Sequence, residues 1–133
     1  NPKNINTIPF CLHTDRLIFF RIMIYLTDVN SDNGPLHILP LNYNGYEKLK
    51  KYKSSFYKSY KRWNSMPYRI NTDFESVSME GEIGSVVLWN GNIPHKAGIL
   101  KEGNTRKVII LEYESPEQYN YRIRNNIVQS VNF

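Results

Sequence analysis

Four side chains in this sequence could hold a metal ion and a carboxylate-bearing ligand together. His13 and Asp15 form an H-x-D motif, and two residues at this spacing on an extended chain project from the same face. His95 lies far along the chain, and Arg106 follows it in the same stretch. Imidazoles and carboxylates bind metal ions, and a guanidinium can form two parallel hydrogen bonds to a carboxylate. These residue types indicate a metal site with an anion-binding arginine beside it.

Each of these patterns alone is more typical of a structural role. An isolated H-x-D is usually a hydrogen-bonded pair at a strand end, and a histidine near a turn is usually solvated. Their combination favours a site, because a β-fold can bring a late histidine back to an early strand. His37 alternates with Leu36 and Ile38, so we expect it to face away from the core and exclude it as a ligand.

Two short strands are expected in the stretch that contains the late histidine. Residues 85–89 and 107–113 are rich in Val, Ile and aromatic residues, and turn signals occur at 90–91 and 102–104. This pattern predicts two strands folded into a hairpin.

The predicted hairpin would place His95 and Arg106 on one pocket wall. With the second turn centred on Glu102 and Gly103, His95 lies opposite residue 110, and Arg106 sits on the same face of the strand. The offset between them is about 13 Å at roughly 3.3 Å per residue. An extended guanidinium and a small diacid could bridge that gap together.

Residues 17–27 are almost continuously apolar and predict a bend at 16–18 followed by a buried strand at 19–26. Arg21 lies in the middle of this strand. A charge there either finds a partner or lines a polar cavity, unless the strand lies at an edge and the side chain points outward. Both interpretations remain open from the sequence, and Arg21 and Tyr25 are candidates for a cavity wall.

The remaining chain supplies further short elements and one helical insertion. We expect a short strand at 8–12, a turn at 27–35, a strand at 35–40, a strand at 74–79 and a short helix in the tail at 114–133.

A basic amphipathic helix is predicted at about 47–63, within an insertion at about 45–64. Aromatic and aliphatic residues recur there at three- and four-residue steps with lysines between them, and the formal charge of +5 is concentrated around this segment. We favour an aromatic face that packs on the outside of a sheet. The alternative is a recruitment surface for an anionic partner. Helical spacing explains the aromatic residues better than a nucleic-acid platform does.

Composition indicates one folded domain or part of one. The chain has 133 residues, 41% of them hydrophobic, and no apolar run approaches the length of a membrane span. Cys11 is the single cysteine, which rules out a disulfide within the chain and favours a reducing compartment such as the cytoplasm. The chain begins with Asn1 in what reads as ongoing structure, so we expect a piece of a longer protein. No feature indicates an oligomeric state.

The predicted elements form an all-β barrel or sandwich with a helical insertion. Two histidines and one carboxylate that converge on such a fold make a facial triad, the arrangement associated with non-haem Fe(II) oxygenases. Three protein ligands on one face leave the other positions of the metal open for a chelating cosubstrate and dioxygen.

The sequence resembles the phytanoyl-CoA dioxygenase-like family of Fe(II)/2-oxoglutarate-dependent oxygenases. The motifs that carry the resemblance are LHTD at 12–15, YLTDVNSDNGPLHILP at 25–40 and GSVVLWNGNIPHKAGILKEGNTRKVIILEY at 84–113. The resemblance implies a double-stranded β-helix, which is a cupin-like jelly roll. Residues 1–133 would be the C-terminal part of that single domain, an incomplete jelly roll that lacks N-terminal elements.

By this resemblance, His13, Asp15 and His95 are expected to bind Fe(II), and Arg106 is expected to pair with the distal carboxylate of 2-oxoglutarate. The implied enzyme hydroxylates a small organic substrate with dioxygen and releases succinate and CO2. Asp15 stands where related halogenases have a small residue, which favours hydroxylation. Ala97 departs from the Ser or Thr that often helps to hold 2-oxoglutarate.

Residues 40–43 also depart from the family, which has Pro-Gly-Ser-His there.

Two other classes of function remain open. One is a cupin-like metal-binding jelly roll without oxygenase activity, and the other is a binding module that acts through the basic helix. The motifs do not select a substrate among the small molecules that the family uses.

Overall fold

A computed structural model describes residues 9–15, 20–40, 68–69, 74–91 and 93–124 of the chain. The basic helix and its insertion, expected at 45–64, lie outside the described residues.

Eight strands and one helix occur in the described part of the chain. They are β1 (His13–Thr14), β2 (Phe20–Tyr25), β3 (Leu36–Ile38), β4 (Tyr68–Arg69), β5 (Val77–Met79), β6 (Val86–Asn90), β7 (His95–Ala97), β8 (Val108–Tyr113) and α2 (Pro116–Arg124). The strand expected at 8–12 is wrong, because the described residues 9–12 form no strand and β1 begins only at His13. The other expected strands and the tail helix are present; β6 is shifted by one residue, and the rest have shorter bounds than expected.

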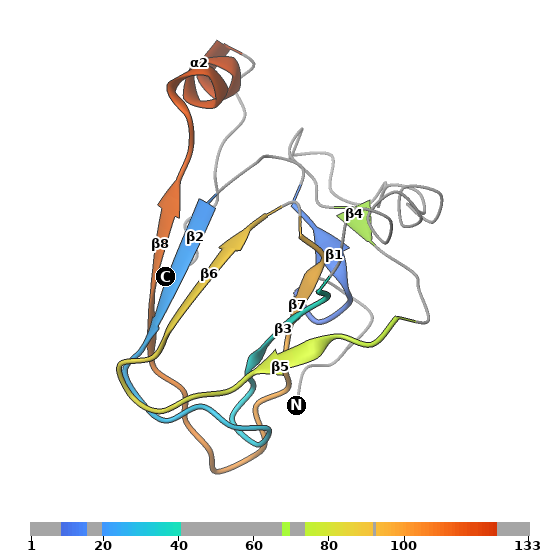
Figure 1. The fold of residues 1–133 in the computed structure, drawn as a ribbon, viewed down its shortest axis with the longest axis vertical. Helices are drawn as coiled ribbons and strands as arrows, with labels where there is room; N and C mark the ends of the chain where they lie inside the picture. The colour runs from blue at the N-terminus through green and yellow to red at the C-terminus, as the bar shows by residue number, and fades with distance from the viewer. Residues whose placement is uncertain (1–8, 16–19, 41–67, 70–73, 92, 125–133) are drawn as a thin grey trace.

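The strands form two antiparallel sheets. One has five strands in the order β4-β1-β7-β3-β5, and the other has three in the order β6-β2-β8. Figure 1 shows the two sheets on opposite sides of the molecule, with α2 beyond the end of β8. The prediction of an all-β, jelly-roll-like fold is confirmed.

The core lies between the two sheets, because its residues come from both. Met23, Tyr25 and Trp89 from the three-stranded sheet meet Leu36 from the five-stranded sheet. The alternation of a strand places every second residue of β2 inward, so Met23 and Tyr25 are buried while Phe20 is exposed. The Tyr25 hydroxyl donates a hydrogen bond to the carbonyl oxygen of Met79 in β5, which ties one sheet to the other.

The predicted hairpin of β6 and β8 is wrong. Both strands pair with β2, which lies between them. His95 pairs with His13 and Ile38 in the five-stranded sheet, whereas Ile110 pairs with Met23 in the other sheet. The strand pairing that would have placed His95 and Arg106 on one face is therefore not formed.

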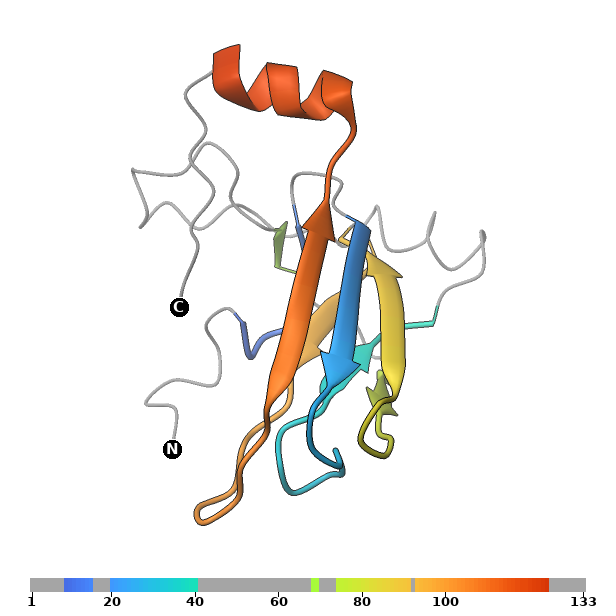
Figure 2. The ribbon, with the colours of Figure 1, turned by 90° about the vertical axis from the view of Figure 1, so that its left-hand side faces the viewer.

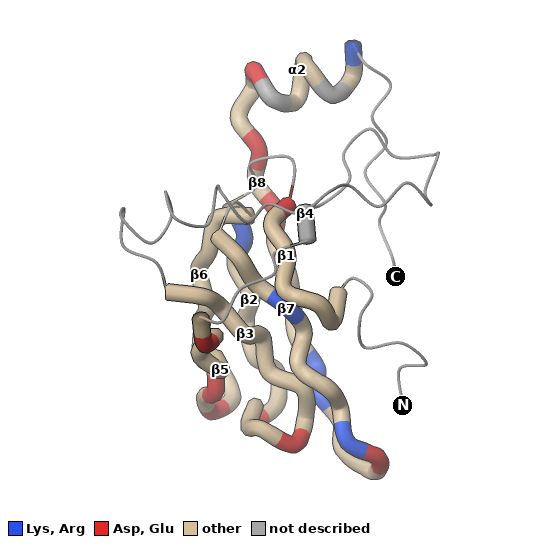
Figure 3. Tube along the Cα trace, turned by 90° about the vertical axis from the view of Figure 1, so that its right-hand side faces the viewer, with Lys and Arg blue, Asp and Glu red and all other residues tan. Residues whose placement is uncertain are grey.

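The outer face of the three-stranded sheet is apolar, and it faces the viewer in Figure 2. Among its residues, Val86, Leu88 and Ile109 are exposed. Many acidic positions lie elsewhere, in the loops at the end of the sheets away from α2 (Figure 3). No helix among the described residues combines the length and hydropathy that a bilayer crossing requires.

Candidate metal centre

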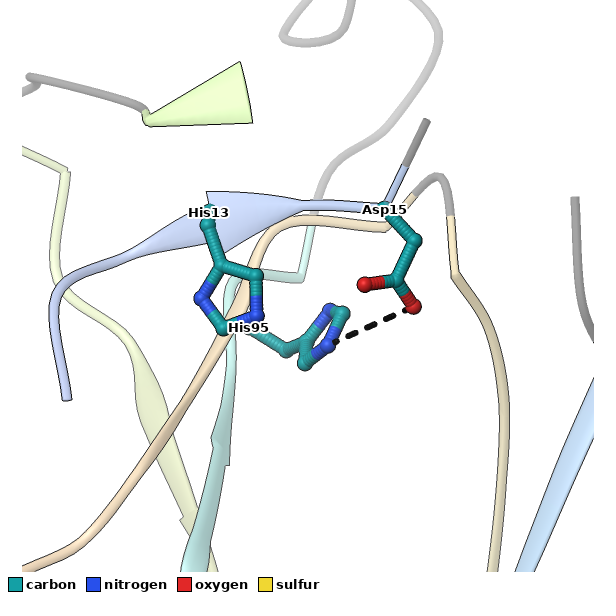
Figure 4. A group of neighbouring side chains, drawn as sticks. All are labelled: His13, Asp15 and His95. Atoms are coloured by element: carbon teal, nitrogen blue, oxygen red, sulfur yellow. Dashed lines mark ion pairs between the residues drawn. The ribbon is translucent and has the colours of Figure 1, made fainter. Parts of the chain in front are cut away.

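His13, Asp15 and His95 converge in the structure. His13 lies in β1, Asp15 follows that strand directly, and His95 opens β7. One ligand atom from each residue lies within 4.8 Å of those from the other two. Figure 4 shows both imidazoles and the carboxylate turned toward one another. The sequence therefore identified three residues that the fold brings together.

Strand pairing sets this arrangement. His13 and His95 are direct partners in β1 and β7, and their ring centroids are 4.5 Å apart. The backbone N–H of Asp15 donates to the carbonyl oxygen of Gly91 at 2.8 Å, which fixes the chain just after β1. A Cβ atom on Gly91 would lie 2.7 Å from Asp15 Oδ2, so the carboxylate occupies space that only glycine leaves.

Both histidines present their Nε2 atoms to the centre. The Nδ1 atom of His13 lies 2.8 Å from the carbonyl oxygen of Cys11, and that of His95 lies 2.8 Å from the carbonyl oxygen of Ile93. A carbonyl oxygen only accepts hydrogen bonds, so each Nδ1 carries the hydrogen and each Nε2 keeps its lone pair. Metal-binding histidines in proteins are oriented by the same kind of contact.

Burial keeps both imidazoles neutral. It is the main cause that lowers the pKa of His13 from 6.5 to about 4, and the neighbouring His95 lowers it further. Burial likewise lowers the pKa of His95 to about 4, while its bond to Ile93 opposes that change. At neutral pH both rings are therefore unprotonated, as metal coordination requires.

The carboxylate is also largely buried. Burial raises the pKa of Asp15 from its usual 3.8, and the positive charge of Arg21 is the main influence that lowers it again. Arg21 Nη1 lies 2.7 Å from Asp15 Oδ2. The guanidinium thus favours the ionised carboxylate that a metal ion would bind.

Arg21 has a second acidic partner and an aromatic neighbour. Its Nε atom lies 2.7 Å from Glu112 Oε1, and its Cζ atom lies 5.9 Å from the ring centroid of Trp89. Because β2 is the central strand of its sheet, the edge-strand interpretation of Arg21 is wrong and the interpretation with partners is confirmed.

These side chains fit a divalent metal ion. His95 Nε2, with its lone pair, lies 3.8 Å from Asp15 Oδ2, so two electron-rich atoms face each other. Asp15 Oδ2 is buried and accepts no well-aligned hydrogen bond from the described residues, although Arg21 is close. A cation between His95 Nε2 and Asp15 Oδ2 would remove the repulsion between these two electron-rich atoms. Two imidazoles and one carboxylate are also the donor set that Fe(II) takes in facial triads.

Arg106 is held by a residue outside this cluster. It donates a hydrogen bond from Nη1 to the carbonyl oxygen of Gly34. Burial lowers the pKa of its guanidinium, and the charge interaction with Tyr25 opposes that change. Gly34 is four residues before Ile38, the partner of His95. The role of Arg106 stays a prediction.

His37 faces away from the cluster, as the sequence led us to expect. Ile38 and His95 are cross-strand partners, so the adjacent His37 points to the opposite face of β3, outside the cluster. Ala97 lies in β7 and pairs with Leu36. It offers no side-chain oxygen to a ligand.

Sequence reasoning missed Trp89 and Glu112. Each is the direct partner of Arg21 across a strand pair, and neither was marked by a motif. The indole Nε1–H of Trp89 is buried and has no acceptor among the described residues. A charge in an apolar strand was the available signal, since Arg21 required partners from the neighbouring strands.

Comparison with known proteins gives one match. A family model described as phytanoyl-CoA dioxygenase (PhyH) matches residues 8–108, a range that contains all three residues of the cluster and Arg106. No curated protein and no solved structure matches the chain significantly.

Proposed function

Since the chain belongs to the phytanoyl-CoA dioxygenase family, we propose that it is an Fe(II)- and 2-oxoglutarate-dependent oxygenase that hydroxylates a small organic substrate. In the overall reaction 2-oxoglutarate is oxidised and loses CO2 to give succinate. One atom of dioxygen enters the succinate, and the other enters the substrate as a hydroxyl group in place of hydrogen.

The observation that carries this proposal is the cluster of His13, Asp15 and His95. Their ligand atoms meet within 4.8 Å, and the rings are neutral with Nε2 directed inward. In the proposal these three residues hold Fe(II) on one face. Iron bound there would supply the electrons and the open positions that dioxygen activation requires.

Arg106 is the proposed partner of the distal carboxylate of 2-oxoglutarate. A guanidinium suits this task because it forms two parallel hydrogen bonds to a carboxylate. Arg106 is partly buried. Its guanidinium carries five N–H donors, and the hydrogen bond to Gly34 uses one of them. Ala97 cannot contribute a hydroxyl, so this arginine is the main candidate.

Asp15 supports hydroxylation as the outcome. A carboxylate at this position occupies the place at the metal that a small residue would leave open to halide. The surrounding chain serves to orient the ligands and to limit water, since both histidines are only 4% exposed.

Anaerobic reconstitution with Fe(II) and 2-oxoglutarate tests the proposal. We expect a metal-to-ligand charge-transfer absorption band when both are added, and succinate when oxygen is admitted. The His95→Ala variant should give neither signal, while His37→Ala should give both. A folded protein that binds Fe(II) but forms no succinate with any substrate candidate, and shows no charge-transfer band, would exclude the oxygenase and leave a metal-binding jelly roll.

A further inference from the structure

We propose that Arg21 is a positioning residue for the metal centre, which holds the Asp15 carboxylate in place while Glu112 holds Arg21. The inference rests on the metal site of the proposed function and adds two residues to it. It concerns how the carboxylate is oriented and does not depend on the identity of the substrate.

Cross-strand register brings the three residues of the three-stranded sheet together. Arg21 pairs with Trp89 in β6 on one side and with Glu112 in β8 on the other. Directly opposed residues in antiparallel strands lie on the same face, so these side chains form one row. Trp89 is a core residue, which shows that the row faces the interior between the sheets.

This Trp89–Arg21–Glu112 row contacts the other sheet through Asp15. Arg21 is 2.7 Å from the carboxylate of Asp15 and 2.7 Å from that of Glu112. The side chains of Arg21 and Asp15 are only 20% and 14% exposed. Water therefore screens this pair less than it screens an ordinary surface ion pair.

Arg21 completes a set of outer supports for the three proposed ligands. Backbone carbonyl oxygens of Cys11 and Ile93 orient the two imidazoles through Nδ1. The corresponding contact of Asp15 is the guanidinium of Arg21. A carboxylate has about four lone-pair sites, so one contact with Arg21 restricts its rotation and leaves sites for a metal ion.

Positioning and simple charge predict opposite effects on metal affinity. A guanidinium near a divalent cation repels it, so removal of the charge alone would tighten metal binding. Removal of a support for a ligand weakens metal binding, typically by about 10–100-fold. The sign of the change in affinity therefore distinguishes the two roles.

Glu112 acts through Arg21 in this scheme. The planar guanidinium can contact one carboxylate through Nε and another through Nη1, as it does here. A lysine ammonium is a compact charge on a flexible stem and lacks this fork. We therefore expect Lys at position 21 to restore the charge but only part of the positioning.

Titration with Co(II), followed by visible absorption of the metal-bound protein, tests the inference without turnover. We expect Arg21→Met to raise the Kd for Co(II) by roughly 10–100-fold and to alter the absorption spectrum. Glu112→Gln should change both in the same direction by a smaller factor, and Arg21→Lys should lie between Arg21→Met and the wild type. Arg124→Met, on the exposed helix α2, is the matched control and should leave both unchanged.

A second background separates positioning from general damage to the fold. In Asp15→Ala protein, Arg21→Met should cause no further loss of affinity, or should tighten binding, because only charge repulsion remains. Tighter binding by Arg21→Met in the wild-type background would overturn the inference. Equal losses in both backgrounds, which a merely structural role produces, would overturn it as well.

The inference and the proposed function can fail separately. If Co(II) affinity responds to Arg21 as expected but Fe(II) protein forms no succinate from 2-oxoglutarate, the positioning role stands and the oxygenase function fails. If succinate forms but Arg21→Met leaves Co(II) binding and spectrum unchanged, the function stands and the positioning role is wrong.

Discussion

His13 and His95 are direct cross-strand partners, and their ring centroids lie 4.5 Å apart between β1 and β7. One pairing of two short strands therefore sets the separation of both proposed nitrogen ligands. Asp15 follows two residues after His13 and reaches the same centre, as the H-x-D spacing predicts.

Substitution of any of the three clustered residues should weaken metal binding strongly. We expect His13→Ala, Asp15→Ala and His95→Ala each to raise the Kd for Fe(II) or Co(II) by more than roughly 100-fold, beyond the effect of losing an outer support. Equilibrium dialysis with metal analysis measures this. His37→Ala is the matched control, because His37 lies on the opposite face of β3. Unchanged stoichiometry in His95→Ala protein would place the metal elsewhere.

Acidification should destabilise the metal-free protein. The pKa of His13 and that of His95 are both about 4 in the folded chain, against 6.5 for an ordinary histidine. Well above pH 6.5 both rings are unprotonated in the folded and the unfolded chain, so they have no effect on stability there. As the pH falls from 6.5 toward 4, the unfolded chain binds protons that the folded chain does not, so the free energy of unfolding decreases.

Urea unfolding in chelator at pH 7.5 and pH 5.5 measures this effect. The histidines should lower the free energy of unfolding by roughly 1 kcal/mol each between these values. A double variant, His13→Gln with His95→Gln, retains Asp15 and the other carboxylates, so the difference between its profile and that of the wild type isolates the two rings. Parallel profiles would contradict the prediction.

Arg106 should affect 2-oxoglutarate and not the metal. We expect Arg106→Lys to raise the KM for 2-oxoglutarate by at least about tenfold, because a lysine cannot form the two parallel bonds of a guanidinium. The Kd for Co(II) should stay within about twofold of the wild type. Lys107→Met changes an exposed neighbour and serves as the control. An unaltered KM in Arg106→Lys would assign the cosubstrate carboxylate to another residue.

A methyl group at Gly91 should disturb the carboxylate ligand. The added Cβ would lie 2.7 Å from Asp15 Oδ2 and 3.0 Å from its Cβ, so the Asp15 side chain must move. We expect Gly91→Ala to weaken Co(II) binding by roughly tenfold. Gly81→Ala introduces a similar crowding, 2.6 Å from Ser85 Oγ and 2.9 Å from Ser85 Cβ, at a position outside the cluster, and should leave Co(II) binding unchanged.

The hydroxyl of Tyr25 should contribute to stability. Tyr25→Phe removes the donor to the Met79 carbonyl oxygen and leaves that acceptor without its partner between the sheets. The expected loss is about 1–3 kcal/mol in the free energy of unfolding, measured by urea denaturation. Tyr113→Phe removes an exposed hydroxyl and should change it by less than about 0.5 kcal/mol.

Local pattern was sufficient to predict the fold class and two of the three residues of the cluster. Runs of β-branched and aromatic residues mark β2, β6 and β8, and all three are strands in the structure. The H-x-D motif identified His13 and Asp15 because side-chain direction on an extended chain depends only on spacing. His95 was a candidate because a β-fold can bring a late histidine back to an early strand, and the resemblance to a family then implied that it is a metal ligand.

Strand pairing could not be read from the sequence in the same way. The predicted hairpin assumed that β6 and β8 pair because they are close along the chain, whereas β2 lies between them. Which strand lies between two others in a sheet depends on how the apolar faces of the two sheets pack together. For the same reason Glu112 could not be recognised, since its contact with Arg21 exists only in the observed register.

β1 is only two residues long, and it pairs with β7 through His13 and His95 alone. So short a strand forms few backbone hydrogen bonds, and a divalent ion bound by both histidines would link it to its neighbour. Bound metal would then add folding stability by mass action, about 2.7 kcal/mol at a hundredfold excess over Kd. Chelation should speed amide hydrogen exchange at Thr14 and Asp15 before it affects β2, so metal supply would set how long the site persists in its assembled form.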